Sequence, residues 1–274
     1  MRSILIVLWL ATIGCGGSND APRTITLATT TSTRDSGLLD VLVPMFEQET
    51  GIVVKVVAVG SGQALAMGRR GDVDVLLTHA PEAEERFVAE GHGIERRPVM
   101  HNDFVLVGPR SDPARVRETR STTEAFARIA DSRSPFVSRG DESGTHSKER
   151  SIWGETGIVP EGDWSIEAGS GMAQTLRLAS EKEAYTLADR GTFLAQRERL
   201  DLEITLQGDP ALRNRYAVIV VNPRQRPHVD IEAARRFADF LLAPDTQSTI
   251  GRFGVERFGE PLFFPHDAEE DEQS

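Results

Sequence analysis

The chain of 274 residues has little of several residue types, and each shortage excludes a class of protein. Lysine occurs only as Lys55, Lys148 and Lys182, so no polybasic segment exists to hold an anionic membrane surface. Acidic residues outnumber basic ones 42 to 31, which gives a net charge of -11. This charge has the wrong sign for a protein that wraps a phosphate backbone, so nucleic acid is not an expected partner.

The chain also lacks an apolar run long enough to span a membrane. The run at residues 4–13 would rise about 15 Å as a helix, half of a bilayer core of roughly 30 Å. The single cysteine, Cys15, follows this run after one small residue and has no partner for a disulfide. The segment resembles a bacterial lipoprotein signal, with Thr12 where leucine is usual. It predicts a signal peptide at 1–14, acylation of Cys15 and a flexible tether at 15–22, with an ordinary secretion signal as the alternative.

What remains has the composition of a compact globular protein, with 39% hydrophobic and 27% charged residues. Strand-like and helix-like segments alternate after the tether, which is typical of an α/β protein with a mainly parallel sheet. The predicted strands are 24–29, 52–59, 73–77, 104–107, 135–138, 185–187, 202–206 and 216–221. Helices are predicted between them, one with a capping-box pattern that begins at Ser121 and one with a proline, Pro81, at its start.

Two of these strands are placed to connect one sheet with another, which predicts two α/β lobes joined by a double-crossover hinge. We expect lobe I to comprise residues 23–107 and 217–265, and lobe II to comprise residues 108–216. Residues 266–274 are acidic and featureless, and are predicted to form a disordered tail.

Three polar loops, each between an apolar strand and a helix, carry the candidate chemistry. Residues 29–33 are five successive hydroxyl residues, whereas a helix cap needs one. Residues 60–63 form a Gly-Ser-Gly-Gln loop, whose glycines let the backbone approach a ligand. Because ligands of parallel α/β sheets lie beyond the carboxyl ends of the strands, where helix amides are unpaired, both loops are candidate anion sites. A plain cap and a tight turn are the alternatives.

The third loop, residues 138–146, is the most informative. Arg139 offers a planar fork of donors for a tetrahedral oxyanion, and Asp141 is placed to hold it. Hydroxyls and backbone amides follow at the helix start, from Ser143 to Thr145. The alternative is a surface ion pair between Arg139 and Asp141, worth about 0–1 kcal/mol.

Enzyme and regulator functions find less support. Asp141, Ser143 and His146 are the residue types of a hydrolase triad, but the Gly-x-Ser-x-Gly pattern is absent around Ser143. The histidines lie in separate segments without cysteine ligands, which does not favour a metal site. A ligand-sensing domain of a transcription regulator would need a DNA-binding module and no secretion signal.

Six segments together resemble the tungstate-binding proteins of bacterial ABC importers: 29–32, 60–65, 71–81, 102–109, 138–146 and 183–192. The resemblance covers nearly all of the chain after the tether. It implies a type II periplasmic-binding-protein fold whose lobes close on one dehydrated tungstate or molybdate, with no enzymatic activity and no cofactor. It also implies an extracytoplasmic protein that delivers its ligand to an ABC permease and its ATPase. We expect this protein to be a monomer, anchored to the membrane by the lipid predicted on Cys15.

The oxyanion contacts that the resemblance implies are Thr29, Thr30, Thr31, Ser32, Ser61, Arg139, Ser143, Gly144 and Thr145. Ser61 departs from the threonine common in the family but retains a hydroxyl. Affinity must come from local donors, because charges are screened over about 8 Å at physiological salt. Chemistry alone leaves phosphate and sulfate open as ligands.

Overall fold

The structure, a computed structural model, describes residues 22–141, 143–224 and 228–266. The predicted signal peptide, Cys15 and nearly all of the tether therefore lie outside the described residues. So does the predicted acidic tail beyond its first residue, His266, whose backbone N–H donates to the carbonyl of Val99 at 3.1 Å.

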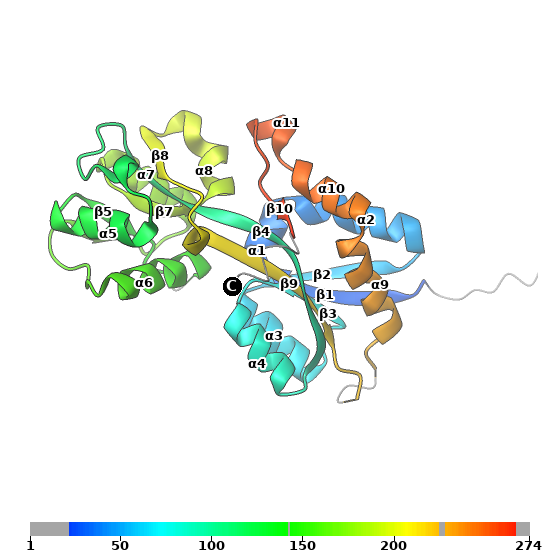
Figure 1. The fold of residues 1–274 in the computed structure, drawn as a ribbon. Coiled ribbons are helices and arrows are strands. Elements are labelled where there is room, and N and C mark those ends of the chain that lie inside the picture. Colours follow the sequence, from blue (N-terminus) through cyan, green and yellow to red (C-terminus); the bar gives the residue numbers. More distant parts are fainter. Residues whose placement is uncertain (1–21, 142, 225–227, 267–274) are drawn as a thin grey trace, which may run out of the picture.

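Two bodies joined by long strands make up the molecule (Figure 1). The larger one, lobe I, is built from both ends of the described chain. Its elements are β1 (Thr24–Thr30), α1 (Thr31–Asp35), α2 (Leu38–Thr50), β2 (Val53–Val59), α3 (Ser61–Arg70), β3 (Val75–Thr78), α4 (Pro81–Ala89), β4 (Gly93–Pro109), β9 (Arg213–Val221), α9 (Ile231–Leu242), α10 (Pro244–Arg252), α11 (Val255–Phe258) and β10 (Phe264–Pro265).

The smaller body, lobe II, comes from the middle of the chain. Its elements are the 3₁₀-helix η1 (Val116–Glu118), α5 (Thr122–Asp131), β5 (Phe136–Ser138), α6 (Gly144–Thr156), β6 (Ser165–Glu167), α7 (Met172–Glu181), β7 (Thr186–Asp189), α8 (Arg190–Gln196), the 3₁₀-helix η2 (Arg197–Arg199), β8 (Leu202–Leu206) and the 3₁₀-helix η3 (Pro210–Leu212).

The sheet of lobe I has the strand order β10-β4-β9-β3-β1-β2, with β1 parallel to both β2 and β3. Helices cover both of its sides, with α3 and α4 on one and α2, α9 and α10 on the other (Figure 1). Successive strand residues point to opposite faces. One core therefore contains Leu27, Leu77 and Val220, and the other contains Ala28, Leu76 and Ile219. Burial on both faces explains the continuous apolar runs in the sequence.

The predicted α/β architecture is confirmed, but strand β4 begins well before the predicted 104–107. Its first half carries charged residues that do not suggest a strand, yet it pairs with the apolar strand β9. The charges find partners beside the sheet: Arg96 pairs with the buried Glu84 at 3.0 Å, and Arg97 pairs with Asp239. The segment is a strand because of its neighbour, not because of its own pattern.

Strand β4 changes partners along its length and so connects the two lobes. Up to Asp103 it pairs with β9, whereas from Phe104 to Pro109 it pairs with β7 and β8 of lobe II. This change of pairing partner falls inside the segment predicted as lobe I. The predicted boundaries of the two lobes stay a prediction. Strands β4 and β9 together form the double connection between the lobes that the sequence predicts.

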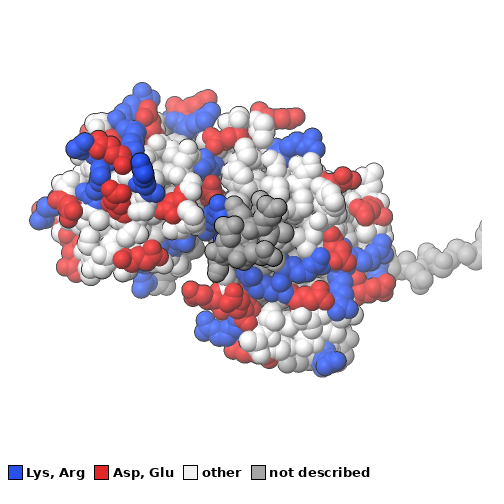
Figure 2. Space-filling model, in the orientation of Figure 1, with Lys and Arg blue, Asp and Glu red and all other residues white. Residues whose placement is uncertain are grey.

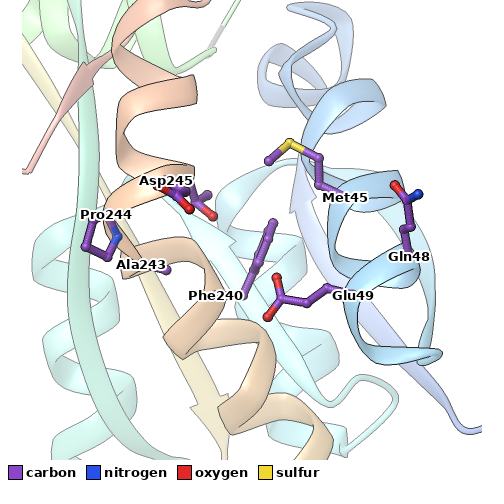
Figure 3. Close-up of a pocket in the computed structure, with 8 residues that line it drawn as sticks. Met45, Gln48, Glu49, Phe240, Ala243, Pro244 and Asp245 are labelled. Carbon is purple, nitrogen blue, oxygen red and sulfur yellow. The ribbon is translucent and has the colours of Figure 1, made fainter.

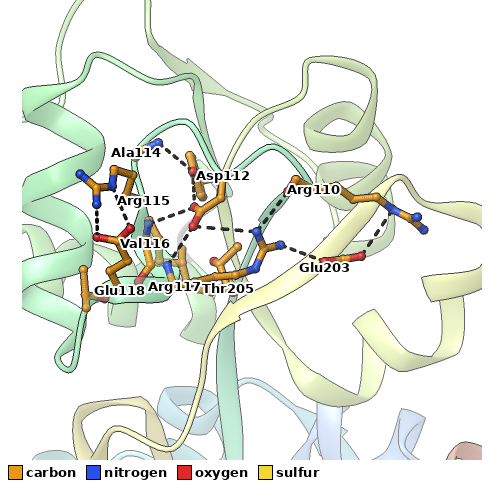
Figure 4. Close-up of polar contacts among 12 residues, drawn as sticks. Arg110, Asp112, Ala114, Arg115, Val116, Arg117, Glu118, Glu203 and Thr205 are labelled. Atoms are coloured by element: carbon orange, nitrogen blue, oxygen red, sulfur yellow. Dashed lines mark hydrogen bonds and ion pairs between the residues drawn. The ribbon is translucent and has the colours of Figure 1, made fainter.

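The entry of the chain into lobe II is held by Asp112 (Figure 4). Its carboxylate accepts the hydroxyl of Tyr185 at 2.6 Å and the backbone N–H groups of Val116 and Arg117 at 3.0 Å each. Beneath this turn, the ring of Tyr185 fills the space over Gly108, where a Cβ would lie 2.3 Å from it. Glycine is therefore required at position 108.

Candidate functional site

The polar loops of lobe I lie at one edge of its sheet because the parallel strands end there together. In the register of the sheet Thr30 is paired with Val59, and Thr29 with Leu77. The loops that follow these strands, including Ser61 and His79, are thus neighbours. This is the carboxyl edge where ligands of parallel α/β sheets bind.

The hydroxyl residues after β1 divide into two groups. Thr29 is fully buried, and its hydroxyl donates to the carbonyl of Leu77 at 2.8 Å. Thr30 is the N-cap of α1 and accepts from the N–H of Thr33 at 3.3 Å. Thr31 and Ser32 have exposed side chains. Since a hydroxyl has one proton to donate, Thr29 has none left for an anion in this arrangement. Thr31 and Ser32 are the exposed hydroxyl residues of this loop, and the Ser32 hydroxyl also shares a hydrogen bond with that of Thr30 at 3.1 Å.

Ser61 is the first residue of α3 and is partly exposed, and its N-cap, Gly60, supplies no side-chain cap. The first amides of a helix have no intrahelical acceptor. The serine hydroxyl and these amides together form a group of donors beside the β1–α1 loop.

Arg139 lies between β5 and α6, and its side chain is held on two sides. Its Nε donates to the carbonyl of Ser170 at 2.8 Å, and its Nη2 pairs with Asp141 at 2.8 Å. Its backbone N–H donates to the carboxylate of Glu149, on α6, at 3.1 Å. With a side chain that is 14% exposed, the guanidinium is fixed at the surface of lobe II rather than extended into solvent.

The helix that follows begins with the other predicted residues of lobe II. Ser143 is its N-cap, and its hydroxyl accepts the N–H of His146 at 3.3 Å. Gly144 is the first helical residue, and Thr145 is buried at 8% exposure. Arg139 and the N-terminus of α6 are thus joined through Asp141, which also accepts the N–H of Ser143 at 3.1 Å.

Two carboxyl groups of this loop have shifted pKa values of opposite direction. Partial burial of Asp141 acts to raise its pKa, but hydrogen bonds from Ser143 and the charge of Arg139 outweigh this and leave the pKa below its ordinary value. Burial raises the pKa of Glu149 to about 7, against the hydrogen bonds it accepts from Ser138 and Arg139. A carboxyl that is half protonated near neutral pH therefore lies directly beneath the loop.

Two groups of residues near these loops were not predicted from the sequence. One is Ser170, the acceptor for Arg139, in the segment Gly169-Ser170-Gly171 before α7. It repeats the Gly-Ser-Gly tripeptide that precedes and begins α3, and this repetition is the signal that could have found it.

The other group lies on the strands that connect the lobes. Tyr216 is 1% exposed, and its hydroxyl lies beside the side chains of Ser32 and Thr33. It also accepts from Asn214 at 3.2 Å, and the ring of His79 lies 4.8 Å from its own. No local pattern distinguishes this tyrosine from a core residue of an apolar strand, so the sequence had no signal for it.

A large cavity elsewhere does not involve these loops. It has a volume of about 620 Å³ and lies between α2 and the junction of α9 and α10, lined by residues such as Met45, Phe240 and Asp245 (Figure 3). None of the predicted contacts lines it.

On the face in Figure 2, acidic and basic side chains are interspersed over both lobes.

Within the described part of the chain, no cluster of three or more His, Cys, Asp or Glu side chains is arranged to hold a metal ion. Among the same residues, no helix combines the length and the apolar character needed to cross a bilayer.

Comparison with known proteins places this arrangement in a family. A family profile described as the PBP superfamily domain matches residues 17–245. The tungstate-binding protein TupA of Peptoclostridium acidaminophilum is 47% identical over 275 residues, which cover 96% of this chain and 96% of that protein. The solved structure of the tungstate-binding protein TupA from Desulfovibrio alaskensis is 43% identical, with a TM-score of 0.84 over 89% of this chain and 99% of that one.

A solved structure described as the tungstate ABC transporter from Geobacter sulfurreducens is 46% identical, with a TM-score of 0.71 over 83% of this chain and 97% of that one. The chain therefore belongs to the PBP superfamily and, within it, to the family of the TupA proteins. The resemblance and the type II fold predicted from the sequence are confirmed. Its relatives are named as binding proteins rather than enzymes.

Proposed function

We propose that this protein is an extracytoplasmic solute-binding protein that captures tungstate, or its close analogue molybdate, between its lobes and delivers it to an ABC permease with its ATPase. The observation that carries the proposal is the guanidinium of Arg139, held by Ser170 and Asp141 beside the N-terminus of α6. A fixed fork of donors next to free helix amides suits a tetrahedral oxyanion. The names of the relatives supply the particular oxyanion.

The chemistry of the donors supports selection by shape. A dehydrated oxyanion needs a donor for each oxygen, and a buried donor left unpaired costs about 1–3 kcal/mol. Thr31, Ser32 and Ser61 from lobe I, with Arg139 and the start of α6 from lobe II, offer donors from two sides. An anion of the wrong shape would leave some of them unpaired.

Titration calorimetry of the purified mature protein with tungstate, molybdate, sulfate and phosphate tests this function. We expect tungstate and molybdate to bind at least about tenfold more tightly than sulfate and phosphate. Tight binding of sulfate or phosphate alone would assign a different oxyanion. Turnover of a generic ester panel would support the hydrolase alternative.

The predicted lipid anchor completes the proposal. Acylation of Cys15 would hold the monomeric binding protein at the membrane that contains its permease, without a spanning helix. Mass spectrometry of the native membrane fraction should find a mature chain that begins at an acylated Cys15. An unmodified Cys15, or a chain that begins elsewhere, removes the anchor and leaves the oxyanion proposal standing.

A further inference from the structure

A histidine of lobe I lies close to the start of the lobe II helix at the proposed site. A Cβ placed on Gly144, the first residue of α6, would lie 3.3 Å from Cε1 of His79. The two residues belong to different lobes, and the imidazole faces this position with a carbon atom. The helix therefore comes close to the ring without a hydrogen bond through this atom, and a side chain at position 144 would press on it.

His79 is held firmly on its own side. The residues on either side of it are tied to the fully buried carboxylate of Glu84, through the hydroxyl of Thr78 at 2.7 Å and the backbone N–H of Ala80 at 2.8 Å. Glu84 is in turn paired with Arg96 at 3.0 Å. The backbone that carries the imidazole thus has little freedom to retreat.

The ring itself is fixed by the strands that connect the lobes. It lies against Tyr216 at 4.8 Å between ring centroids, beside Asn214. Burial lowers the pKa of His79 to about 4, so the ring is neutral at physiological pH. It contributes shape to the site and no positive charge.

We propose that His79 is the stop against which α6 rests, and that its contact with Gly144 sets the distance between the donors of the two lobes. The inference rests on the proposed oxyanion function and adds to it a positioning residue that determines the size of anion accepted. With a rigid stop, smaller anions such as sulfate cannot draw the lobes close enough to satisfy every donor. A Cβ at position 144 would press on the ring, so either His79 or α6 would have to shift by a few tenths of an ångström.

A double-mutant cycle tests the contact, with tungstate as the ligand. Gly144→Ala should weaken tungstate binding by roughly threefold to tenfold when His79 is present, and by clearly less when it is combined with His79→Ala. His79→Ala alone should lower the preference for tungstate over sulfate. Gly154→Ala is the matched control, because a Cβ at this position of the same helix meets nothing within 4 Å.

Several outcomes would overturn the proposal. If Gly144→Ala costs the same affinity with and without His79, its Cβ acts on the anion and not on the histidine. If Gly144→Ala binds as tightly as the parent, the stop does not exist. Should His79→Ala fold poorly, His79→Asn keeps a polar partner for Asn214 in the same cycle.

A ligand-free measurement separates this proposal from the proposed function. Urea unfolding of the parent, the two single variants and the double variant gives a second cycle. If the two positions are in contact, the changes in the urea midpoint should not be additive, whether or not tungstate binds. Failure of the parent to bind any oxyanion, with the coupling present, refutes the function and keeps the contact. Oxyanion binding with strictly additive midpoints refutes the contact and keeps the function.

Discussion

The loop after β1 and the loop after β5 occupy equivalent places, each between a strand and a helix at the carboxyl edge of a sheet, but they offer different chemistry. The first offers neutral hydroxyls, of which Thr29 is already committed to a neighbouring strand. The second offers the guanidinium of Arg139, with Asp141 as a counter-charge at 2.8 Å. One lobe is thus suited to shape recognition, and the other to charge.

The difference explains how a protein of net charge -11 is suited to an anion. Within the proposed site, the positive charge comes from Arg139 alone among the three loops, and its neighbours hold it in place, so it acts at short range. The neutral hydroxyls opposite add directed donors without attracting other anions from a distance. The comparison predicts that variants of the two loops will differ in how much they change tungstate affinity and the free energy of unfolding.

The largest effect is expected at Arg139. A hydrogen bond to a charged group contributes about 1.5–3 kcal/mol, so Arg139→Ala should weaken tungstate binding by roughly ten- to more than a hundredfold in calorimetry. Arg139→Lys should also lose affinity, since an ammonium cannot donate to both Ser170 and an anion in the geometry of the fork. A folded Arg139→Ala protein with parental affinity would contradict the assignment of charge to this loop.

A pH effect of intermediate size should belong to the lobe II loop alone, through Glu149. Its pKa is about 7 in the folded protein against an ordinary value of 4.5, so between these values the native state binds a proton that the unfolded state releases. The stability contributed by this carboxyl is therefore lost as the pH rises through this window.

Relative to Glu149→Gln, the parent's free energy of unfolding should fall by more than about 1 kcal/mol between about pH 5 and about pH 8. Urea denaturation across the pH range measures this difference. Glu161→Gln, at an exposed carboxylate elsewhere in lobe II, serves as the control. Parallel stability curves for the parent and Glu149→Gln would show that Glu149 titrates as an ordinary carboxyl.

The smallest effects are expected from the neutral hydroxyls of the lobe I loop. Ser32→Ala should weaken tungstate binding by roughly twofold to tenfold, because it removes one neutral donor worth about 0.5–1.5 kcal/mol. Thr29→Val should instead lower the free energy of unfolding by about 1 kcal/mol and leave the affinity nearly unchanged, since its hydroxyl is used by Leu77. Calorimetry and urea denaturation of both variants measure the two effects. The reverse pattern would place Thr29, and not Ser32, at the anion.

Local sequence was sufficient for much of the fold. The predicted cap at Ser121, whose hydroxyl accepts the N–H of Glu124, and the proline start of α4 at Pro81 both appear as expected, because these signals involve only neighbours along the chain. The first half of β4 could not be predicted, because its charged residues are compensated by partners such as Glu84 that approach only when the sheet forms.

For the site, the sequence by itself determined which residue types stand at the strand ends: the hydroxyl run, the Gly-Ser-Gly loop and Arg139. Only the tertiary structure decided which of them have a donor to spare, because that depends on the register between strands, as for Thr29 opposite Leu77. It also decided that Tyr216 and His79 lie between the two loops. A local pattern records burial and capping, whereas contact between residues far apart in the chain exists only after the lobes have packed.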